Sequence, residues 1–331
     1  MRLSVLDQSV ALVGRDEAAS IRETLELAQH CEALGYHRFW VSEHHNLQTI
    51  VGTAPEVLMA AIAARTSRIR VGSAGVMLPH YAALKVAEQF RVLEALAPGR
   101  IDLGVGRAPG GDMRTALALN PNAHHAADAF PQQVRELQAW LAGQAPLGIR
   151  AHPLGPTAPT IWVLGSSDYG AQLAAHFGLP YAFAWFFTDG QGAEDAIEQY
   201  RTLYKPSAAH PRPQVTICVW ALAADTEEAA KLHATPRERW RVDRAQGVFG
   251  PLVPPQEAQA RAYTEAERVM VDRMRQKAMV GTASQVGEKL RALADSLALD
   301  ELVVVTWAHD PQVRRRSYEL LAAEFELGRG I

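Results

Sequence analysis

Two adjacent histidines, His44 and His45, stand directly after a short, largely aromatic and β-branched segment at 39–42. That composition is typical of a buried β-strand. An imidazole titrates near neutral pH, so a histidine at the end of a strand can act as an acid, a base, a metal ligand or an anion partner. The pair is therefore the first candidate site in the chain.

A metal site at this pair would need further ligands of a suitable type. Adjacent residues on a strand point to opposite faces, so His44 and His45 cannot easily bind one ion. No His-x-His pair or carboxylate cluster stands at the end of another predicted strand to complete the set. A metal-dependent hydrolase stays open as an alternative, but it is not the leading interpretation.

The segment 69–77 carries three small residues in succession, Ser73, Ala74 and Gly75. Small residues inside a strand weaken its pairing and are typical of a bulge or of a close approach by a flat group. A planar ring could lie against this run. The same residues could instead give a neighbouring helix room to pack, and the spacing alone favours that second interpretation.

Arg107 follows the predicted strand 100–106 and has glycines on both sides. A guanidinium in that position can clamp a phosphate. It can equally well pair with a neighbouring carboxylate, Asp102 or Asp112. The glycines do not form the dinucleotide-binding fingerprint, because the third glycine falls at the wrong interval.

Gly165, Ser166 and Ser167 end another predicted strand just before a helix begins. The start of a helix exposes backbone N–H groups, and with two hydroxyls beside them it suits a phosphate. Asp168 can serve at the same time as the helix cap. A competing phosphate site is the run 281–284, near the last strands, where barrels often bind phosphate. It ranks second because no arginine at a strand end accompanies it.

The elements that must position these residues alternate along the chain. Eight segments have strand character, and each is followed by an apolar pattern of helical spacing; they lie at 2–6, 39–42, 69–77, 100–106, 161–164, 181–185, 215–220 and 302–306. Eight strands alternating with helices predict an α/β fold, an eight-stranded (β/α) TIM barrel. An open doubly wound sheet with a small second domain is the alternative.

Two stretches interrupt this alternation. Residues 145–159 hold four prolines and indicate a long connection. Residues of about 247–279 form an insertion before the last strand, rich in glycine and proline at its start. Long loops on the active face of a barrel often act as lids, but this insertion could also pack against the barrel or a second subunit. We expect residues 1–331 to form a single domain.

Composition narrows the class of protein further. The chain has 331 residues, 48% of them hydrophobic, and its 33 basic and 36 acidic residues give a net charge of −3. That balance favours neither a nucleic acid nor an anionic membrane as partner. Only Cys31 and Cys218 are present, so no disulfide framework is expected. No segment has the length of a signal peptide core or a membrane helix, and we expect a cytoplasmic protein.

Taken together, the motifs resemble the luciferase-like monooxygenase family, the flavin-dependent barrels related to bacterial luciferase. The resemblance runs from Leu3 to Ala323, and its motifs fall in the same order. They stand at 40–46, 70–79, 98–107, 164–167, 178–180 and 301–305. No single motif is decisive, but the ordered set is strong.

The resemblance implies a role for each candidate residue. His44 corresponds to the active-site histidine beside the flavin ring. The run Ser73, Ala74 and Gly75 corresponds to the bulge that supports the ring, often through a non-proline cis peptide bond. The positions that bind the flavin phosphate correspond to Arg107, Gly165, Ser166 and Ser167, with Tyr169 within reach of the phosphate and Trp185 lining the ring pocket.

The implied activity is that of a monooxygenase that uses reduced FMN as co-substrate, with O₂, to oxygenate a small organic substrate. A separate flavin reductase is the expected partner, since no second nucleotide fold for NAD(P)H is evident, and a homodimer is expected by analogy. The alternatives are a deazaflavin- or NAD(P)H-linked oxidoreductase of the same family, or a flavin-binding protein without turnover. Gly165 stands where bacterial luciferase has a carboxylate, so light emission from a long-chain aldehyde is not implied.

Overall fold

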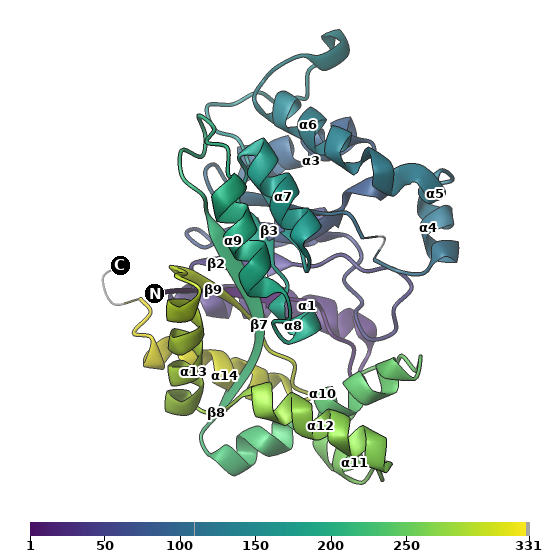
Figure 1. The fold of residues 1–331 in the computed structure, drawn as a ribbon, viewed down its shortest axis with the longest axis vertical. Coiled ribbons are helices and arrows are strands. Elements are labelled where there is room, and N and C mark those ends of the chain that lie inside the picture. The colour runs from purple at the N-terminus through teal and green to yellow at the C-terminus, as the bar shows by residue number, and fades with distance from the viewer. Residues whose placement is uncertain (109, 329–331) are drawn as a thin grey trace.

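Nine parallel strands form one sheet in the computed structural model, which describes residues 1–108 and 110–328 (Figure 1). Eight of them close into a barrel because β6 pairs with β7 and β1 pairs with β9. The predicted TIM-barrel fold is confirmed. The strands are β1 (Arg2–Asp7), β2 (Arg38–Val41), β3 (Arg70–Met77), β4 (Ile101–Gly106), β5 (Thr160–Gly165), β6 (Tyr181–Phe183), β7 (Val215–Ala224), β8 (Met279–Thr282) and β9 (Glu301–Val305).

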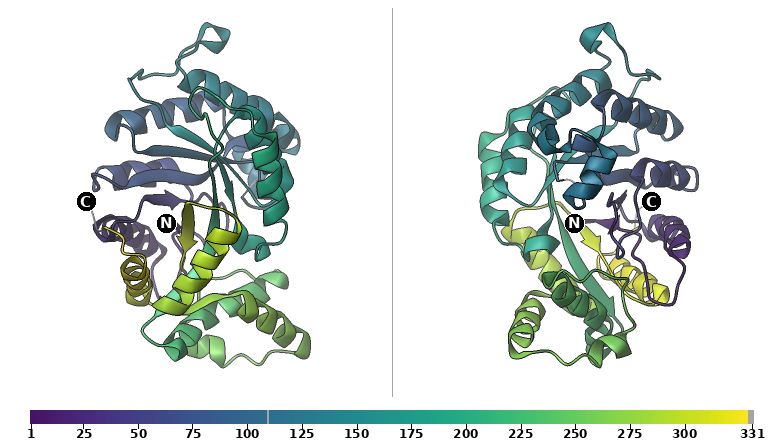
Figure 2. Two further views of the ribbon diagram at one scale, coloured as in Figure 1. Left: turned by 60° about the vertical axis from the view of Figure 1, so that its left-hand side comes forward. Right: turned by 90° about the vertical axis from the view of Figure 1, so that its right-hand side faces the viewer.

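Helices surround the barrel, as the two turned views show (Figure 2). Those whose apolar residues pack in the core around the outside of the barrel are α1 (Glu17–Leu34), α2 (Pro55–Ala63), α3 (Ala83–Leu96), α6 (Phe130–Leu141), α7 (Asp168–Phe177), α9 (Ala193–Leu203), α13 (Ala283–Ser296) and α14 (Pro311–Glu324). The others are α4 (Met113–Leu119), α5 (Ala123–Ala126), α8 (Trp185–Thr188), α10 (Glu227–Ala245), α11 (Pro255–Gln259) and α12 (Glu265–Lys277), with short 3₁₀ turns η1 (Leu78–His80), η2 (Ala127–Ala129) and η3 (Pro146–Gly148).

Side chains of each barrel strand alternate between two apolar clusters, as the pleat of a strand requires. Leu3 and Val5 of β1 point outward and belong to the same core cluster as helix residues such as Leu27 and Phe90. Leu6 of β1 and Trp40 of β2 point inward and fill the barrel. The helices are therefore held to the barrel by one face of each strand, which leaves the other face to shape its interior.

The amino end of the barrel is closed by buried charges. Arg38 donates to Asp102 at 2.8 Å and to Glu301 at 2.7 Å, and Arg70 donates to Asp102 at 2.6 Å. Burial alone would raise the pKa of Asp102, but Arg38 and Arg70 outweigh it and the pKa is lowered. We call this buried cluster of Arg38, Arg70, Asp102 and Glu301 the ionic plug. Because it fills the amino end of the barrel, a ligand site is expected at the other end, where the carboxyl ends of the strands meet.

The insertion before the last strand contains a strand that the sequence did not predict. β7 is longer than the predicted 215–220, and its last four residues pair with β8, outside the barrel. Helices α10, α11 and α12 gather beside it at one end of the molecule (Figures 1 and 2). The competing phosphate site at 281–284 lies on this extension, and the hydroxyl of Thr282 there caps α13.

The predicted strand 181–185 is also too long. β6 ends at Phe183, and Trp185 begins the short helix α8.

In the described ranges, no helix combines the length and apolar character needed to cross a bilayer.

Candidate active site

Two neighbouring cavities open at the carboxyl end of the barrel strands. The smaller has a volume of about 280 Å³ and the larger about 1090 Å³. The residues that line both are Gln8, His44, Met77, Ala108, Phe186 and Phe187. His44 therefore stands where one cavity passes into the other.

One end of the smaller cavity is polar. It is lined by Arg107 and by Gly165, Ser166 and Ser167 at the start of α7. Ser167 is the cap residue of that helix, but its hydroxyl makes no capping bond. The hydroxyls and the helix terminus together form a cradle of donors that suits a phosphate.

Arg107 belongs to this cradle and not to a surface ion pair. Its guanidinium lies over the Tyr169 ring at 3.9 Å. Asp102 is taken up by Arg38 and Arg70, and Asp112 caps α4 by accepting from the Thr115 backbone N–H at 2.8 Å. Across residues 1–108 and 110–328, no carboxylate pairs with Arg107, so the guanidinium can bind an anion.

The floor of the smaller cavity is the irregular part of β3. The register with β4 shifts between Ser73 and Val76, and the Ala74–Gly75 peptide bond is cis, so the expected bulge and cis bond are both present. Ala74 and Gly75 line the cavity. Ser73 lines neither cavity, because its buried hydroxyl donates to the Gly104 carbonyl at 2.9 Å and holds the bulge from below.

Two glycines of β4 give this floor its shape in different ways. A Cβ at Gly104 would overlap the carbonyl oxygen of Ser73, so the backbones of β3 and β4 can approach only without a side chain there. A Cβ at Gly106 would meet nothing closer than Met77 Sδ at 3.9 Å, and Gly106 lines the smaller cavity. The space over Gly106 is open to a flat ligand. The cavity therefore fits a group with a ring at one end and a phosphate at the other.

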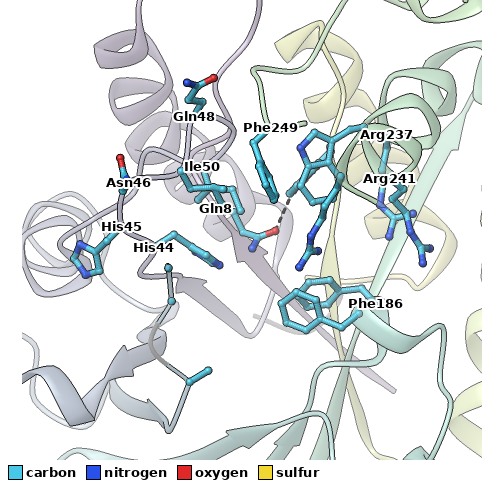
Figure 3. A pocket seen from close by; sticks show the side chains of 18 of the residues that line it. Gln8, His44, His45, Asn46, Gln48, Ile50, Phe186, Arg237, Arg241 and Phe249 are labelled. Atoms are coloured by element: carbon cyan, nitrogen blue, oxygen red, sulfur yellow. Dashed lines mark hydrogen bonds between the residues drawn. The ribbon is translucent and has the colours of Figure 1, made fainter. Parts of the chain in front are cut away.

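His44 lines both cavities, and its ring points into the larger one (Figure 3). Its Nδ1 lies 3.2 Å from the hydroxyl of the buried Ser42. Burial lowers the pKa of His44 to about 4, although Glu43 acts in the opposite direction. The imidazole is thus neutral at neutral pH, and its Nε2 is the nitrogen left to exchange or share a proton in the cavities.

His45 points away from His44, as the alternation of a strand predicts (Figure 3). Its Nε2 lies 2.7 Å from the carboxylate of Glu43, which also accepts from Tyr81 at 2.7 Å and from the Met77 backbone N–H at 3.0 Å. The two histidines therefore differ in role. His44 lines both cavities, whereas His45 lines the larger one alone and, through Glu43, helps to fix the loop after β2 to the end of β3.

The larger cavity has an aromatic wall. Its rings come from several elements and include Trp220, Trp240, Trp307, Phe186 and Phe249. Gln8 accepts a hydrogen bond from Trp307 Nε1 at 3.1 Å, which orients both side chains (Figure 3). Three arginines of α10, at positions 237, 241 and 244, complete the wall. This cavity offers an apolar space beside charged groups.

One of the predicted site residues lies elsewhere. Trp185 lines neither cavity; it packs against the core outside the barrel and against Gly190, because α8 begins at Trp185. Its neighbours Phe186 and Phe187 line the cavities instead. An aromatic run after a strand was the available signal, but the side that each ring takes depends on where the helix begins.

Gln8, Ser42 and Arg237 belong to the site but were not predicted. Gln8 follows the predicted strand 2–6 and Ser42 ends the predicted strand 39–42, so their positions alone could have marked them. Arg237 belongs to an arginine series with spacings of four and three, which places one face of a helix together. Within the described parts of the chain, no three His, Cys, Asp or Glu side chains come together in a way that could hold a metal ion.

Known proteins resemble this chain over nearly its whole length. The sequence model of the luciferase-like monooxygenase family matches residues 1–300. The protein YwcH of Bacillus subtilis (strain 168) is 44% identical over 329 residues, covering 98% of each chain. N-acetyl-S-alkylcysteine monooxygenase of the same organism is 37% identical, covering 97% of each chain. The crystal structure of apo-MsnO8 shares 36% identity and a TM-score of 0.92, covering 98% of both chains.

Proposed function

Because the chain belongs to the luciferase-like monooxygenase family, as its motifs indicated, we propose that it is an FMN-dependent monooxygenase acting on a small organic substrate. One observation carries the proposal. The smaller cavity joins a phosphate cradle at Arg107 and Ser166 to a flat floor at Gly75, and His44 stands beyond that floor. This order of groups matches a flavin mononucleotide, whose phosphate and ring lie at opposite ends.

In this assignment the chain's residues bind and orient the cofactor. Arg107, Ser166 and Ser167 hold the phosphate through charge-assisted hydrogen bonds. Ala74 and Gly75 support the ring, and Phe186 and Phe187 cover it from the side of the larger cavity. A bound reduced flavin supplies the two electrons by which one atom of O₂ becomes water while the other enters the substrate.

His44 is the proposed catalytic residue. The Ser42 hydroxyl can donate to Nδ1, which leaves Nε2 with the ring proton and directs it into the cavities. The Nε2–H of a neutral imidazole can donate a hydrogen bond to a developing negative charge, and the ring does this without placing a fixed positive charge beside the flavin. A substitution of His44 should therefore lower the turnover rate, whereas substitutions in the phosphate cradle should lower FMN affinity.

The segment 247–279 is proposed as the lid. Gly247 and Phe249 line the larger cavity at its start. The segment is tied across the mouth, because Thr49 donates to the Gly250 carbonyl at 2.6 Å and Leu252 exchanges backbone hydrogen bonds with the 11–13 segment. Closing this cover over the site would keep water from the reacting groups.

We also propose a separate flavin reductase as the source of reduced FMN. The described residues form one nine-stranded sheet, with no second nucleotide-binding fold in those ranges. A homodimer remains a prediction by analogy. Deazaflavin remains the alternative cofactor, and competition between the two flavins for the smaller cavity distinguishes them.

The deciding experiment supplies the protein with chemically reduced FMN and ¹⁸O₂ and a panel of thioethers, including N-acetyl-S-alkylcysteines. That choice follows the name of one relative. We expect one ¹⁸O atom per product molecule by mass spectrometry, and none without the protein. Tight binding of reduced FMN with release of hydrogen peroxide alone, for every compound, would instead indicate a flavin-binding protein without turnover.

A further inference from the structure

Arg237 is a cation of the larger cavity that pairs with no carboxylate among the described residues. It stands on α10, partly buried, and its guanidinium lies over the Trp220 ring at 4.3 Å. In the ranges 1–108 and 110–328, no side chain or carbonyl forms a hydrogen bond or ion pair with it. A guanidinium that has lost part of its water and found no acceptor is a strong site for an anion.

The other arginines of this helix differ from Arg237 in a way that can be tested. Arg241 also lines the cavity, but Asp189 neutralises it through two hydrogen bonds, of 2.7 and 2.8 Å. Arg239 points to the other side, where it pairs with Asp243 and Glu257. Arg244 is exposed at the rim and lies over Trp240 and Phe187. Arg237 is thus the partly buried charge of this wall that is left uncompensated.

Other charges at the cavity do not remove this excess. Asp112 lines the cavity, but it is engaged by Asn46 and by the backbone of α4. Burial and the nearby Arg241 lower the pKa of Arg237 to about 9, although the carboxylates of Asp189 and Glu238 act in the opposite direction, so Arg237 is protonated at neutral pH. The buried Trp220 Nε1 also lacks an acceptor within the described ranges. Two donors of one wall therefore stand without acceptors.

We propose that Arg237 binds an anionic group of the substrate, a carboxylate or a group of similar charge, while the aromatic wall holds its apolar part. The volume of about 1090 Å³ accommodates a molecule of metabolite size beside the smaller cavity. His44 lies between the cavities, so a substrate anchored at Arg237 would extend toward the cofactor. Calling the bound anion the substrate rests on the proposed function; the anion site itself does not.

The flavin phosphate is the other source of an anion for Arg237. The cradle of Arg107, Ser166 and Ser167 is the better phosphate site, because it combines a guanidinium, two hydroxyls and a helix terminus. Arg237 offers a guanidinium among rings, which suits an organic anion with an apolar body. Competition with oxidised FMN separates the two sources.

The test measures binding to the flavin-free protein by calorimetry. The probes are phenylacetate, phenylbutyrate and phenylhexanoate, each paired with its uncharged primary amide. For at least one pair we expect the acid to bind about 10-fold or more tightly than the amide, as a charge-assisted hydrogen bond provides. Arg237→Met should abolish this preference, Arg237→Lys should keep part of it, and the control Arg239→Met should leave it unchanged.

Several results would overturn the anion site. These are equal binding of acid and amide in every pair, no binding of either, or a preference that persists in Arg237→Met with thermal unfolding unchanged. Loss of the preference in the presence of saturating FMN would assign Arg237 to the cofactor phosphate and overturn the substrate role. Because binding is read without turnover, failure of the monooxygenase assay leaves this result standing, and the reverse is also true.

Discussion

Arginines lie at both ends of the barrel, but among the described residues those at the amino end are paired with carboxylates and two of those at the carboxyl end are not. At the amino end, Arg38 and Arg70 share Asp102 at 2.8 and 2.6 Å. At the carboxyl end, Arg107 and Arg237 lie over aromatic rings and, in the described ranges, pair with no carboxylate. A paired buried charge stabilises the fold once it is formed, whereas a cation without an anion keeps its binding capacity for a ligand.

This contrast separates residues of stability from residues of function. Substitutions at the amino end should lower the free energy of unfolding and leave ligand affinity alone. Substitutions at the carboxyl end should do the reverse. A residue that changed both quantities would break the division.

Asp102→Asn should have the largest effect. It removes one of the two carboxylates that pair with the buried Arg38 and leaves Glu301 alone, and removing one partner of a buried ion pair destabilises by about 3–5 kcal/mol. Urea unfolding measures the loss, and FMN affinity should be unchanged in the folded fraction. Asp225→Asn is the control, since the Asp225–Arg316 pair is exposed to solvent and should contribute little to the free energy of unfolding. Equal losses of stability in the two variants would show that the buried ion pairs of Asp102 contribute no more than an exposed pair.

Arg107→Ala tests the opposite end. We expect FMN affinity to fall by about 1.5–3 kcal/mol, the range for a charge-assisted hydrogen bond, with little change in unfolding. Fluorescence titration with FMN measures it. Arg135→Ala is a matched control, because Arg135 also lies near an aromatic ring, Phe177, at 6.0 Å, but lines neither cavity. An affinity equal to that of the wild-type protein would refute the phosphate role of Arg107.

Gly104 and Gly106 lie two residues apart on β4, and we expect one to affect stability and the other to affect FMN affinity. Gly104→Ala should destabilise by about 1–3 kcal/mol, because its Cβ overlaps the Ser73 carbonyl oxygen. Gly106→Val places its methyl groups in open space above the floor of the smaller cavity, so unfolding should change by less than about 0.5 kcal/mol. FMN binding should be lost in Gly106→Val. Normal FMN binding by that variant would mean that the flavin does not occupy this cavity.

The fold could be predicted from the sequence because its signals are local. Apolar periodicity and helix stops repeat from one strand to the next, and they also place His44 and Arg107 at strand ends. β8 was missed because its four residues pair only with an extension of β7, which no local pattern reveals.

The candidate site was predictable in its cradle and floor, and less so in its walls. The rings at 186–187 and Arg237 take their places from the start of α8 and from the packing of the insertion on α10. Both are tertiary effects. Whether Arg107 is free to bind a ligand also depends on residues distant in the sequence. Asp102 does not pair with Arg107, because Arg38 and Arg70 form ion pairs with it instead.

His44→Gln tests the carboxyl end of the barrel through the pH dependence of stability. Burial lowers the pKa of His44 to about 4 in the folded protein, below its ordinary value of 6.5. Between these two values the unfolded chain binds more protons than the folded one, so the wild-type protein loses stability as pH falls from 6.5 toward 4. Allowing for its partial exposure, we expect a loss of about 1 kcal/mol between pH 7 and pH 5 relative to His44→Gln.

Urea unfolding of both proteins at each pH gives this difference, and the other histidines cancel in the comparison. The same variant should bind FMN normally and turn over more slowly, because the amide fills the space of the imidazole but cannot exchange its proton. Parallel stability profiles would show that His44 titrates as an ordinary exposed histidine. The proposed mechanism, which requires a neutral His44 ring between the two cavities, would then be contradicted, even if turnover still fell.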